Sequence, residues 1–375
     1  PRRRELLMLS VTLFAGILTF LTALRFLVFL VPFLAFGLGF LFQTAWKHAG
    51  GKKKEYVLRA VIVVLIVLSI LPNFFTSWKT VLRSKTPAQV IKVLDDMNRD
   101  LPSDAVIWCW WDMGYTVQYW ADRATFIDGG SQQRGLRTFV TALPLATANM
   151  NLSVNALKFF SCHGMAGLEK LAAEMGSEKE AVGALRTVLS ATPKECDKTL
   201  KSFGFNLEEY KTFFYPESSG GVYLFLDGSL IGSSYWWYYF GSWDEEKLEG
   251  VHPEMMPVRM QDVGGYAQLA RKEKEINVTS FFADKTRRTD SFVISKLAVC
   301  DPAKGKIDAE VFSDDLDGLV LQVVEKEGIA MAVSESFFDS VFNRLFVAGV
   351  YDNSIYEHVY GSNMFVKVWK AGEGQ

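Results

Sequence analysis

The hexapeptide Trp110-Trp111-Asp112-Met113-Gly114-Tyr115 directly follows the short apolar run of residues 105–109. A short apolar run followed by turn residues is typical of a buried strand, so we expect the hexapeptide to lie where a strand ends. An indole N–H only donates a hydrogen bond, an ionised carboxylate only accepts one, and a hydroxyl does both. The two indoles and Asp112 are therefore suited to binding a serine or threonine hydroxyl. Gly114 has no Cβ, which would let a bound peptide pass close to the main chain.

The same residues also permit a purely structural interpretation. In that interpretation both indoles lie in the hydrophobic core and Asp112 caps a helix. The residue types alone are compatible with either interpretation.

The Trp-Trp-Asp-x-Gly sequence resembles the signature of oligosaccharyltransferase catalytic subunits, membrane enzymes that transfer a lipid-linked glycan to Asn in Asn-X-Ser/Thr. The similarity runs from the apolar segment around Arg25 through the Asp128-Gly129-Gly130 turn to the C-terminus, and the chain resembles the C-terminal part of the bacterial single-subunit, PglB-like enzymes. The resemblance implies that one element binds the acceptor's Ser or Thr, through Trp110, Trp111, Asp112, Gly114 and Tyr115.

Composition excludes some classes of function. The chain has 375 residues and a formal net charge of −2, so its charge gives no indication of a nucleic-acid partner. Its four cysteines show neither Cys-x-x-Cys nor Cys/His spacing, so we expect no zinc motif, no disulfide framework and no metal ligands within this chain.

Three apolar stretches, residues 6–24, 26–46 and 60–78, are each roughly 20 residues long, the length of a helix that crosses a bilayer. We therefore expect three transmembrane helices within residues 1–79. Basic clusters lie before the first stretch, at residues 2–4, and between the second and third stretches, at residues 52–54. Both segments are therefore expected to be cytoplasmic. The sequence thus predicts a multi-pass protein of the inner (cytoplasmic) membrane whose C-terminal domain lies in the periplasm.

Arg25 stands alone between the first two apolar stretches, where a charge is costly unless it reaches the interface or pairs with an anion. A snorkelling anchor and an anion-binding residue are both compatible with this position. The resemblance implies that Arg25 contacts the donor diphosphate, a role that suits the guanidinium fork.

From Thr80 the composition becomes that of a soluble domain. Residues 80–285 predict a mixed α/β domain that carries the Trp-Trp-Asp element, a helical insert over residues 154–214 and a buried strand over residues 222–226. Within the insert, Ser177 and Thr192 each begin a capping-box pattern. Residues 286–375 alternate short apolar runs with turns and predict a C-terminal antiparallel β unit, in which we include a strand at 364–369.

Two positions depart from the family pattern. The bacterial Met-x-x-Ile motif, which lines the acceptor pocket, matches residues 228–231 without a gap, so that Ile231 is kept and Gly228 replaces the methionine. Gln132 stands where a relative has histidine. Ile231 is therefore an expected acceptor contact, whereas Gln132 is not an expected donor contact.

The leading prediction is that the chain is the part of a glycosyltransferase that binds the acceptor Ser or Thr. The intact enzyme is expected to transfer a glycan from a polyprenyl-diphosphate oligosaccharide to Asn in an Asn-X-Ser/Thr polypeptide, with a divalent cation (Mn²⁺ or Mg²⁺) as cofactor. The resemblance implies that the catalytic and metal-binding acids precede Pro1, so this fragment alone is expected to be inactive. The alternatives are a non-catalytic, membrane-anchored periplasmic peptide-binding module and a related membrane glycosyltransferase with another acceptor.

Overall fold

The computed structural model describes the chain over residues 30–48, 86–132, 135–192, 194–258, 270–272, 275–281, 287–312, 318–362 and 364–372, with isolated residues elsewhere. Side chains are not described for Ala45 or for residues 256–258, 275–281 and 287–292. The chain forms two compact units, residues 1–85 and residues 86–375.

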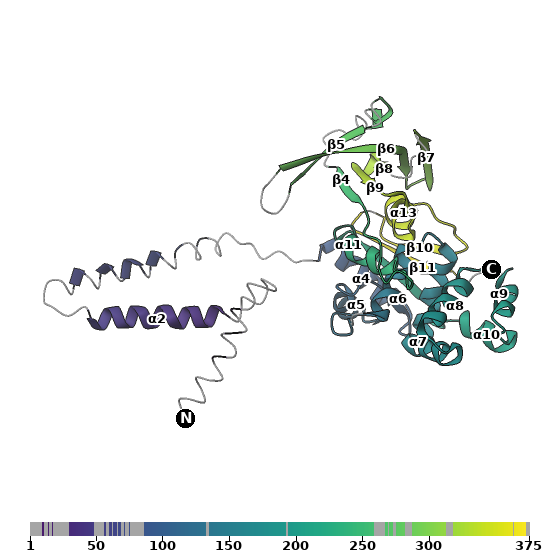
Figure 1. The fold of residues 1–375 in the computed structure, drawn as a ribbon, viewed down its shortest axis with the longest axis horizontal. Helices are drawn as coiled ribbons and strands as arrows, with labels where there is room; N and C mark the ends of the chain where they lie inside the picture. The colour runs from purple at the N-terminus through teal and green to yellow at the C-terminus, as the bar shows by residue number, and fades with distance from the viewer. Residues whose placement is uncertain are drawn as a thin grey trace. The chain divides into compact units, whose positions relative to one another are not determined.

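The first unit contains helix α2 (Val31–His48), which overlaps the second predicted membrane span (Figure 1). Within the described part of the chain, no helix is both long enough and apolar enough to cross a membrane. Most of the first predicted span, about half of the third, and Arg25 lie outside the described residues.

The second unit is built on a five-stranded mixed sheet with the order β10-β11-β3-β1-β2. Its strands are β1 (Val106–Trp108), β2 (Ala124–Thr125), β3 (Val222–Asp227), β10 (Tyr356–Tyr360) and β11 (Val366–Ala371). β2 and β3 run parallel to β1, whereas β11 runs antiparallel to β3 and β10 antiparallel to β11. All six residues of β3 are buried, as expected for a strand covered on both faces. The strands predicted at 105–109 and 222–226 are thus confirmed.

Helices cover both faces of this sheet. α4 (Ala88–Asp100) and α5 (Gly114–Ala121) share one core cluster with Ile107 and Phe225. On the other face, α6 (Leu136–Ala146), α7 (Met150–Met175) and α11 (Ser229–Gly241) share a second cluster with Trp108 and Leu224. Successive residues of a strand point to opposite faces, which explains why neighbouring residues of β1 enter different clusters.

The predicted helical insert is confirmed, and it comprises α7 with α8 (Glu178–Ser190), α9 (Cys196–Ser202) and α10 (Leu207–Phe214) (Figure 1). Ser177 is the N-cap of α8, where its side chain accepts a hydrogen bond from the Glu180 N–H at 3.2 Å. The second capping box is only partly as predicted. Glu195 accepts from Thr192 N–H and Oγ, but α9 begins at Cys196, later than a cap at Thr192 predicts.

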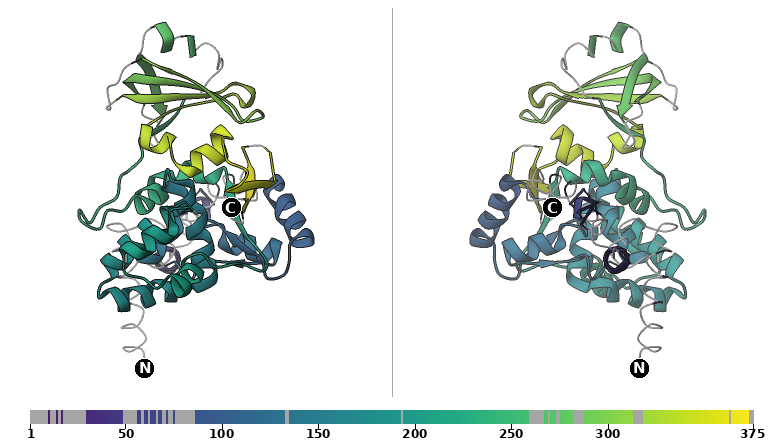
Figure 2. Two further views of the ribbon diagram at one scale, coloured as in Figure 1. Left: turned by 90° about the vertical axis from the view of Figure 1, so that its right-hand side faces the viewer. Right: turned by 90° about the vertical axis from the view of Figure 1, so that its left-hand side faces the viewer.

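A second sheet has the order β4-β9-β8-β6-β5, with β7 beside β6 (Figure 2). Its strands are β4 (Met255–Val258), β5 (Glu275–Phe281), β6 (Arg287–Asp301), β7 (Lys306–Val311), β8 (Leu319–Val324) and β9 (Ile329–Val333). The sheet is mixed rather than antiparallel, because the chain crosses from β7 on one side of β6 to β8 on the other, and β8 therefore runs parallel to β6. The prediction of a wholly antiparallel unit is wrong in this respect.

The strand expected at 364–369 does not join that second sheet. It is β11, and it pairs with β3 of the first sheet over five residue pairs, beginning with Val366 opposite Asp227. Local alternation predicted that this segment is a strand, but its partner lies about 140 residues earlier in the chain, and a local pattern carries no information on such pairing. Three short helices precede β10, namely η2 (Glu325–Glu327), α13 (Glu335–Phe338) and the π-helix η3 (Asn343–Ala348).

Lys367 of β11 connects the first sheet to η3. It is 6% exposed, and its Nζ donates a hydrogen bond to the Phe346 carbonyl at 2.7 Å. Burial lowers the pKa of Lys367 to about 8. The folded chain therefore loses this proton near pH 8, whereas the unfolded chain keeps it until about pH 10.4.

Lys367→Met should remove a pH-dependent contribution to stability. Above pH 8 the unfolded chain binds more protons at Lys367 than the folded chain does, so this residue makes stability rise with pH, by up to about 1.4 kcal/mol per pH unit. Buried groups with raised pKa values, such as Cys109 and Tyr356, act in the opposite direction and are present in both proteins. We expect the free energy of urea unfolding of the parent, minus that of the variant, to rise between pH 8 and 9.5. A difference that does not change with pH would contradict the assignment.

Candidate functional site

The predicted acceptor-binding residues lie at one edge of the first sheet. β1, β2 and β3 are parallel, so their carboxyl ends meet at this edge, and the start of the antiparallel β11 joins them there. In open α/β sheets, ligands bind outside the carboxyl ends of the strands. Each parallel strand is followed by, or ends in, an aspartate at this edge: Asp112 after β1, Asp128 after β2 and Asp227 at the end of β3.

The two adjacent tryptophans differ in burial. Trp110 is 2% exposed and belongs to the core cluster, whereas Trp111 is only partly buried and packs against that cluster. Their rings are 6.4 Å apart and tilted by 55°. The structural interpretation therefore fits Trp110, while Trp111 keeps a surface that a ligand can reach.

Asp112 lies in the turn between β1 and α5, one residue before the N-cap position of that helix, which is Met113. Asp112 thus does not occupy the capping position that the structural interpretation gives it. One of its carboxylate oxygens, Oδ1, is buried, while the residue as a whole is half-buried.

Negative charge gathers around Asp112. The thiol of Cys109 is buried, which raises its pKa, and the charges of Asp112, Asp227 and Asp128 raise it further. Asp227 is 5% exposed, and burial is the main cause of its raised pKa. Hydrogen bonding from Ser229 lowers that pKa, and the charge of Asp112 raises it further. The edge therefore favours ligands that donate hydrogen bonds.

Gly114 has a role that differs from the predicted one. A Cβ on Gly114 would lie 2.5 Å from the Ile127 carbonyl oxygen and 2.6 Å from Cα of Asp128. We expected a bound peptide to pass close to Gly114, but the protein's own residues 127 and 128 occupy that position. Gly114 joins the Trp-Trp-Asp element to the Asp128-Gly129-Gly130 turn, and this contact sets the position of one against the other.

Asp128 fixes the geometry of that turn. Its Oδ1 accepts hydrogen bonds from the Gly130 N–H at 2.9 Å, the Ser131 N–H at 2.7 Å and the Ser131 hydroxyl at 2.8 Å. Its Oδ2 accepts from the Gln118 amide of α5 at 3.1 Å. The Ser131 hydroxyl is the main reason that the pKa of Asp128 lies below its usual value. The Asp128 carboxylate therefore stabilises the turn and links it to α5.

Tyr115 extends from α5 across this turn. Cβ atoms on Gly129 and Gly130 would meet its ring and its hydroxyl, respectively, so the two glycines leave room for the tyrosine. Tyr115 is nevertheless 56% exposed. It can thus contact a ligand while the turn holds its ring in place.

Ile231 lies in the first turn of α11, directly after β3. It is partly buried and packs against the same core cluster as Trp111. Its N–H donates to the Gly228 carbonyl at 3.3 Å, and the Gly228 N–H donates to the Phe365 carbonyl at 3.0 Å. The structure thus brings Ile231 to the same sheet edge as Trp110, Trp111, Asp112 and Tyr115.

The donor contact expected of Arg25 stays a prediction. Arg25 lies outside the described residues, and Gln132 is exposed. The sequence analysis did not identify Asp227 as a residue of this edge. The signal was present, because Asp227 is a carboxylate that directly follows a wholly apolar run.

The described residues offer no ligand set for the expected divalent cation. Among them, no group of three or more His, Cys, Asp or Glu side chains could hold a metal ion. Asp128 Oδ1 already accepts three hydrogen bonds, which leaves it poorly suited to a cation. The function proposed below therefore contains no step through a metal ion held by these residues.

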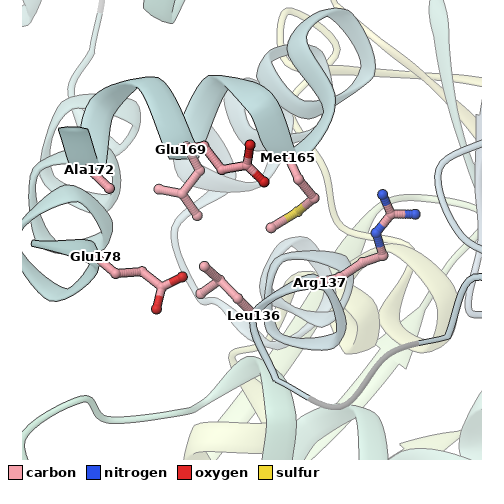
Figure 3. A pocket seen from close by; sticks show the side chains of 7 residues that line it. Leu136, Arg137, Met165, Glu169, Ala172 and Glu178 are labelled. Carbon is pink, nitrogen blue, oxygen red and sulfur yellow. The ribbon is translucent and has the colours of Figure 1, made fainter. Parts of the chain in front are cut away.

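A surface cavity of about 570 Å³ lies elsewhere, between α6, α7 and the start of α8 (Figure 3). Arg137 and Glu178 line it together with apolar side chains such as Met165. Its lining includes none of the predicted acceptor-binding residues, so the cavity is separate from the sheet-edge site.

Comparison with known proteins shows which family the segment that carries the site is similar to. Residues 103–246 match the family model of the STT3/PglB/AglB core domain, a range that contains Trp110 to Tyr115 and Ile231. A dolichyl-phosphooligosaccharide-protein glycotransferase of Methanococcus voltae is 26% identical over 212 residues, which are 54% of this chain and 22% of that protein. An undecaprenyl-diphosphooligosaccharide–protein glycotransferase of Campylobacter jejuni is 26% identical over 129 residues, 34% of this chain and 18% of that protein.

Among solved structures, the C-terminal domain of C. jejuni PglB aligns with a TM-score of 0.48 at 15% identity, covering 75% of this chain and 98% of that one. The chain spans about a fifth of the length of the curated relatives that it matches. The match of residues 103–246 to the STT3/PglB/AglB core domain, together with these relatives, confirms the resemblance to oligosaccharyltransferase catalytic subunits predicted from the Trp-Trp-Asp-x-Gly sequence.

Proposed function

We propose that this chain is the C-terminal part of an oligosaccharyltransferase and that its sheet-edge site binds the Ser or Thr hydroxyl of an Asn-X-Ser/Thr acceptor. The observation that supports the proposal is the location of Trp111, Asp112 and Ile231 at one sheet edge, just after the carboxyl ends of β1 and β3. In the intact enzyme the glycan comes from a polyprenyl-diphosphate donor at the periplasmic side of the inner membrane. The relatives named as glycotransferases support this assignment.

Each side chain has a defined part in acceptor binding. Asp112 accepts the hydrogen bond of the acceptor hydroxyl, and an indole N–H donates one to the same oxygen. Ile231 packs against the methyl group of threonine, and Tyr115 covers the site from the side of the Asp128 turn. Binding the hydroxyl in this way fixes the asparagine two residues earlier, so the chain positions the acceptor while catalytic groups outside it carry out the transfer.

Arg25 binds the donor diphosphate in this proposal. Its guanidinium forms bidentate, charge-assisted hydrogen bonds to phosphate oxygens. A divalent cation bound to the intact enzyme would supply charge stabilisation at the reacting groups, and we expect its ligands to lie outside the described part of this chain.

Acceptor peptides that differ only at the hydroxyl residue test the proposal. A site built to bind a hydroxyl rejects analogues that lack it, because its buried polar groups are left unpaired. We expect the full-length protein to bind fluorescent Asn-X-Thr and Asn-X-Ser peptides at least about tenfold more tightly than Asn-X-Val, measured by anisotropy. Equal affinity for the Thr and Val peptides would overturn the proposal. The alternative, a non-catalytic peptide-binding module, predicts the same preference but no glycan transfer from added lipid-linked donor.

A further inference from the structure

A fourth segment reaches the same sheet edge. β11 is antiparallel to β3 and begins at Val366, opposite Asp227, the last residue of β3. The residues just before Val366 therefore lie beside the residues just after Asp227. Met364 is consequently a neighbour of the start of α11, although it is more than 130 residues away in the sequence.

Two contacts confirm how closely Met364 approaches α11. The Gly228 N–H donates a hydrogen bond to the Phe365 carbonyl at 3.0 Å. A Cβ on Gly228 would lie 2.7 Å from the Met364 carbonyl oxygen, so only glycine at 228 allows the chain to pass there. The backbone of Met364 is thereby held against the turn that begins α11, three residues before Ile231.

The Met364 side chain packs against the same core cluster as two of the proposed acceptor contacts, Trp111 and Ile231. Met364, Trp111 and Ile231 are each partly buried, and all three pack against the cluster that includes Trp110 and Leu230. Asp227 and Val366, by contrast, are neighbours in register, and Val366 belongs to the cluster on the opposite face. Three partly buried apolar side chains, which follow β1 and β3 and precede β11 at this edge, thus pack against the same core cluster.

We propose that Met364 is a specificity-determining residue that contacts the threonine methyl group of the acceptor together with Ile231; this inference rests on the proposed function. A thioether on an unbranched side chain adapts its shape and packs well against methyl groups and aromatic rings. Serine has no methyl group to fill this contact. Met364 therefore favours threonine over serine, while Asp112 recognises the hydroxyl that both share.

The test is the ratio of affinities for Asn-X-Thr and Asn-X-Ser peptides in the full-length protein, measured by fluorescence anisotropy. Met364→Ala should lower the Thr/Ser ratio at least threefold, whereas Met364→Leu should retain most of it. Met364→Gln keeps the length of the side chain but adds polar atoms, and should lower the ratio even if the alanine variant folds poorly. Thermal unfolding of each variant shows whether it is folded.

Met175→Ala is the matched control. Met175 is also partly buried and packs against the same cluster, but it ends α7 within the helical insert, and we expect its variant to keep the parental ratio. An unchanged ratio in folded Met364→Ala and Met364→Gln would overturn the assignment of Met364, as would an equal loss of affinity for both peptides. If the parent protein binds the Thr and Val peptides equally well, the proposed function is wrong. If the parent prefers the Thr peptide and the Met364 variants keep the parental Thr/Ser ratio, only the assignment of Met364 is wrong.

Discussion

Asp112→Ala should lower the affinity of the full-length protein for Asn-X-Thr peptides by about 10- to 100-fold. A hydrogen bond to a charged group contributes about 1.5–3 kcal/mol, and each 1.4 kcal/mol is a factor of ten in affinity. Asp112 has a buried carboxylate oxygen. Of the other two aspartates at this edge, Asp128 already accepts hydrogen bonds within its own turn and Asp227 is 5% exposed, so we expect Asp112 to accept the hydroxyl proton. Fluorescence anisotropy with Thr and Ser peptides measures the loss.

Two further variants show whether the loss of affinity in Asp112→Ala comes from the missing carboxylate. Asp112→Asn keeps the shape and one acceptor oxygen, so its affinity should lie between those of the parent and Asp112→Ala. Asp197→Ala removes an exposed aspartate of the helical insert that pairs with Lys211, and it should bind peptide as the parent does. If Asp112→Ala binds the Thr peptide with parental affinity, the carboxylate serves the fold and not the acceptor.

Gly114→Ala should destabilise the second unit strongly, by about 3 kcal/mol. Alanine is normally the better helix former by about 1 kcal/mol, but here its Cβ would lie 2.5 Å from the Ile127 carbonyl oxygen and 2.7 Å from the Asp128 Cβ. Two of the nearest atoms belong to the backbone of the Asp128 turn and cannot move without breaking its hydrogen bonds. The steric cost therefore outweighs the gain in helix propensity, and the melting temperature should fall by several degrees.

Gly183→Ala is the opposite case and the control for Gly114→Ala. Gly183 lies inside α8, where a Cβ would meet no heavy atom of the described chain within 4 Å. This variant should gain about 0.5–1 kcal/mol from helix propensity. Thermal unfolding of the two variants side by side measures both effects. A Gly114→Ala protein as stable as the parent would show that the two elements do not approach each other as closely as described.

Local patterns predicted much of what positions the site. The apolar run at residues 105–109 predicted β1, and the buried run at 222–226 predicted β3, since both strands are covered on two faces and need continuous apolar sequence. Ser177 and Glu180 predicted the start of α8 because an N-cap is a contact within one turn. The candidate acceptor-binding residues were predicted by a resemblance, and the structure brings Trp111, Asp112 and Ile231 to one edge of the sheet.

What the sequence could not predict depends on contacts between distant residues. The pairing of β11 with β3, and hence the position of Met364, follows from tertiary structure and not from the alternation that identifies a strand. The role of Gly114 depends on the approach of Ile127 and Asp128. Trp110 and Trp111 have the same residue type, and only the packing of the core against one of them distinguishes the buried indole from the partly exposed one.

A thermodynamic cycle tests most directly whether Asp112 binds the acceptor hydroxyl. It uses four affinities, those of Asn-X-Thr and Asn-X-Val peptides for the parent and for Asp112→Ala, and it isolates the interaction between the two groups. If the carboxylate binds the hydroxyl, the preference for Thr over Val should fall at least tenfold in the variant, a coupling free energy of about 1.4 kcal/mol or more. If Asp112→Ala weakens both peptides equally and leaves the preference unchanged, Asp112 does not bind the acceptor hydroxyl and the account is contradicted.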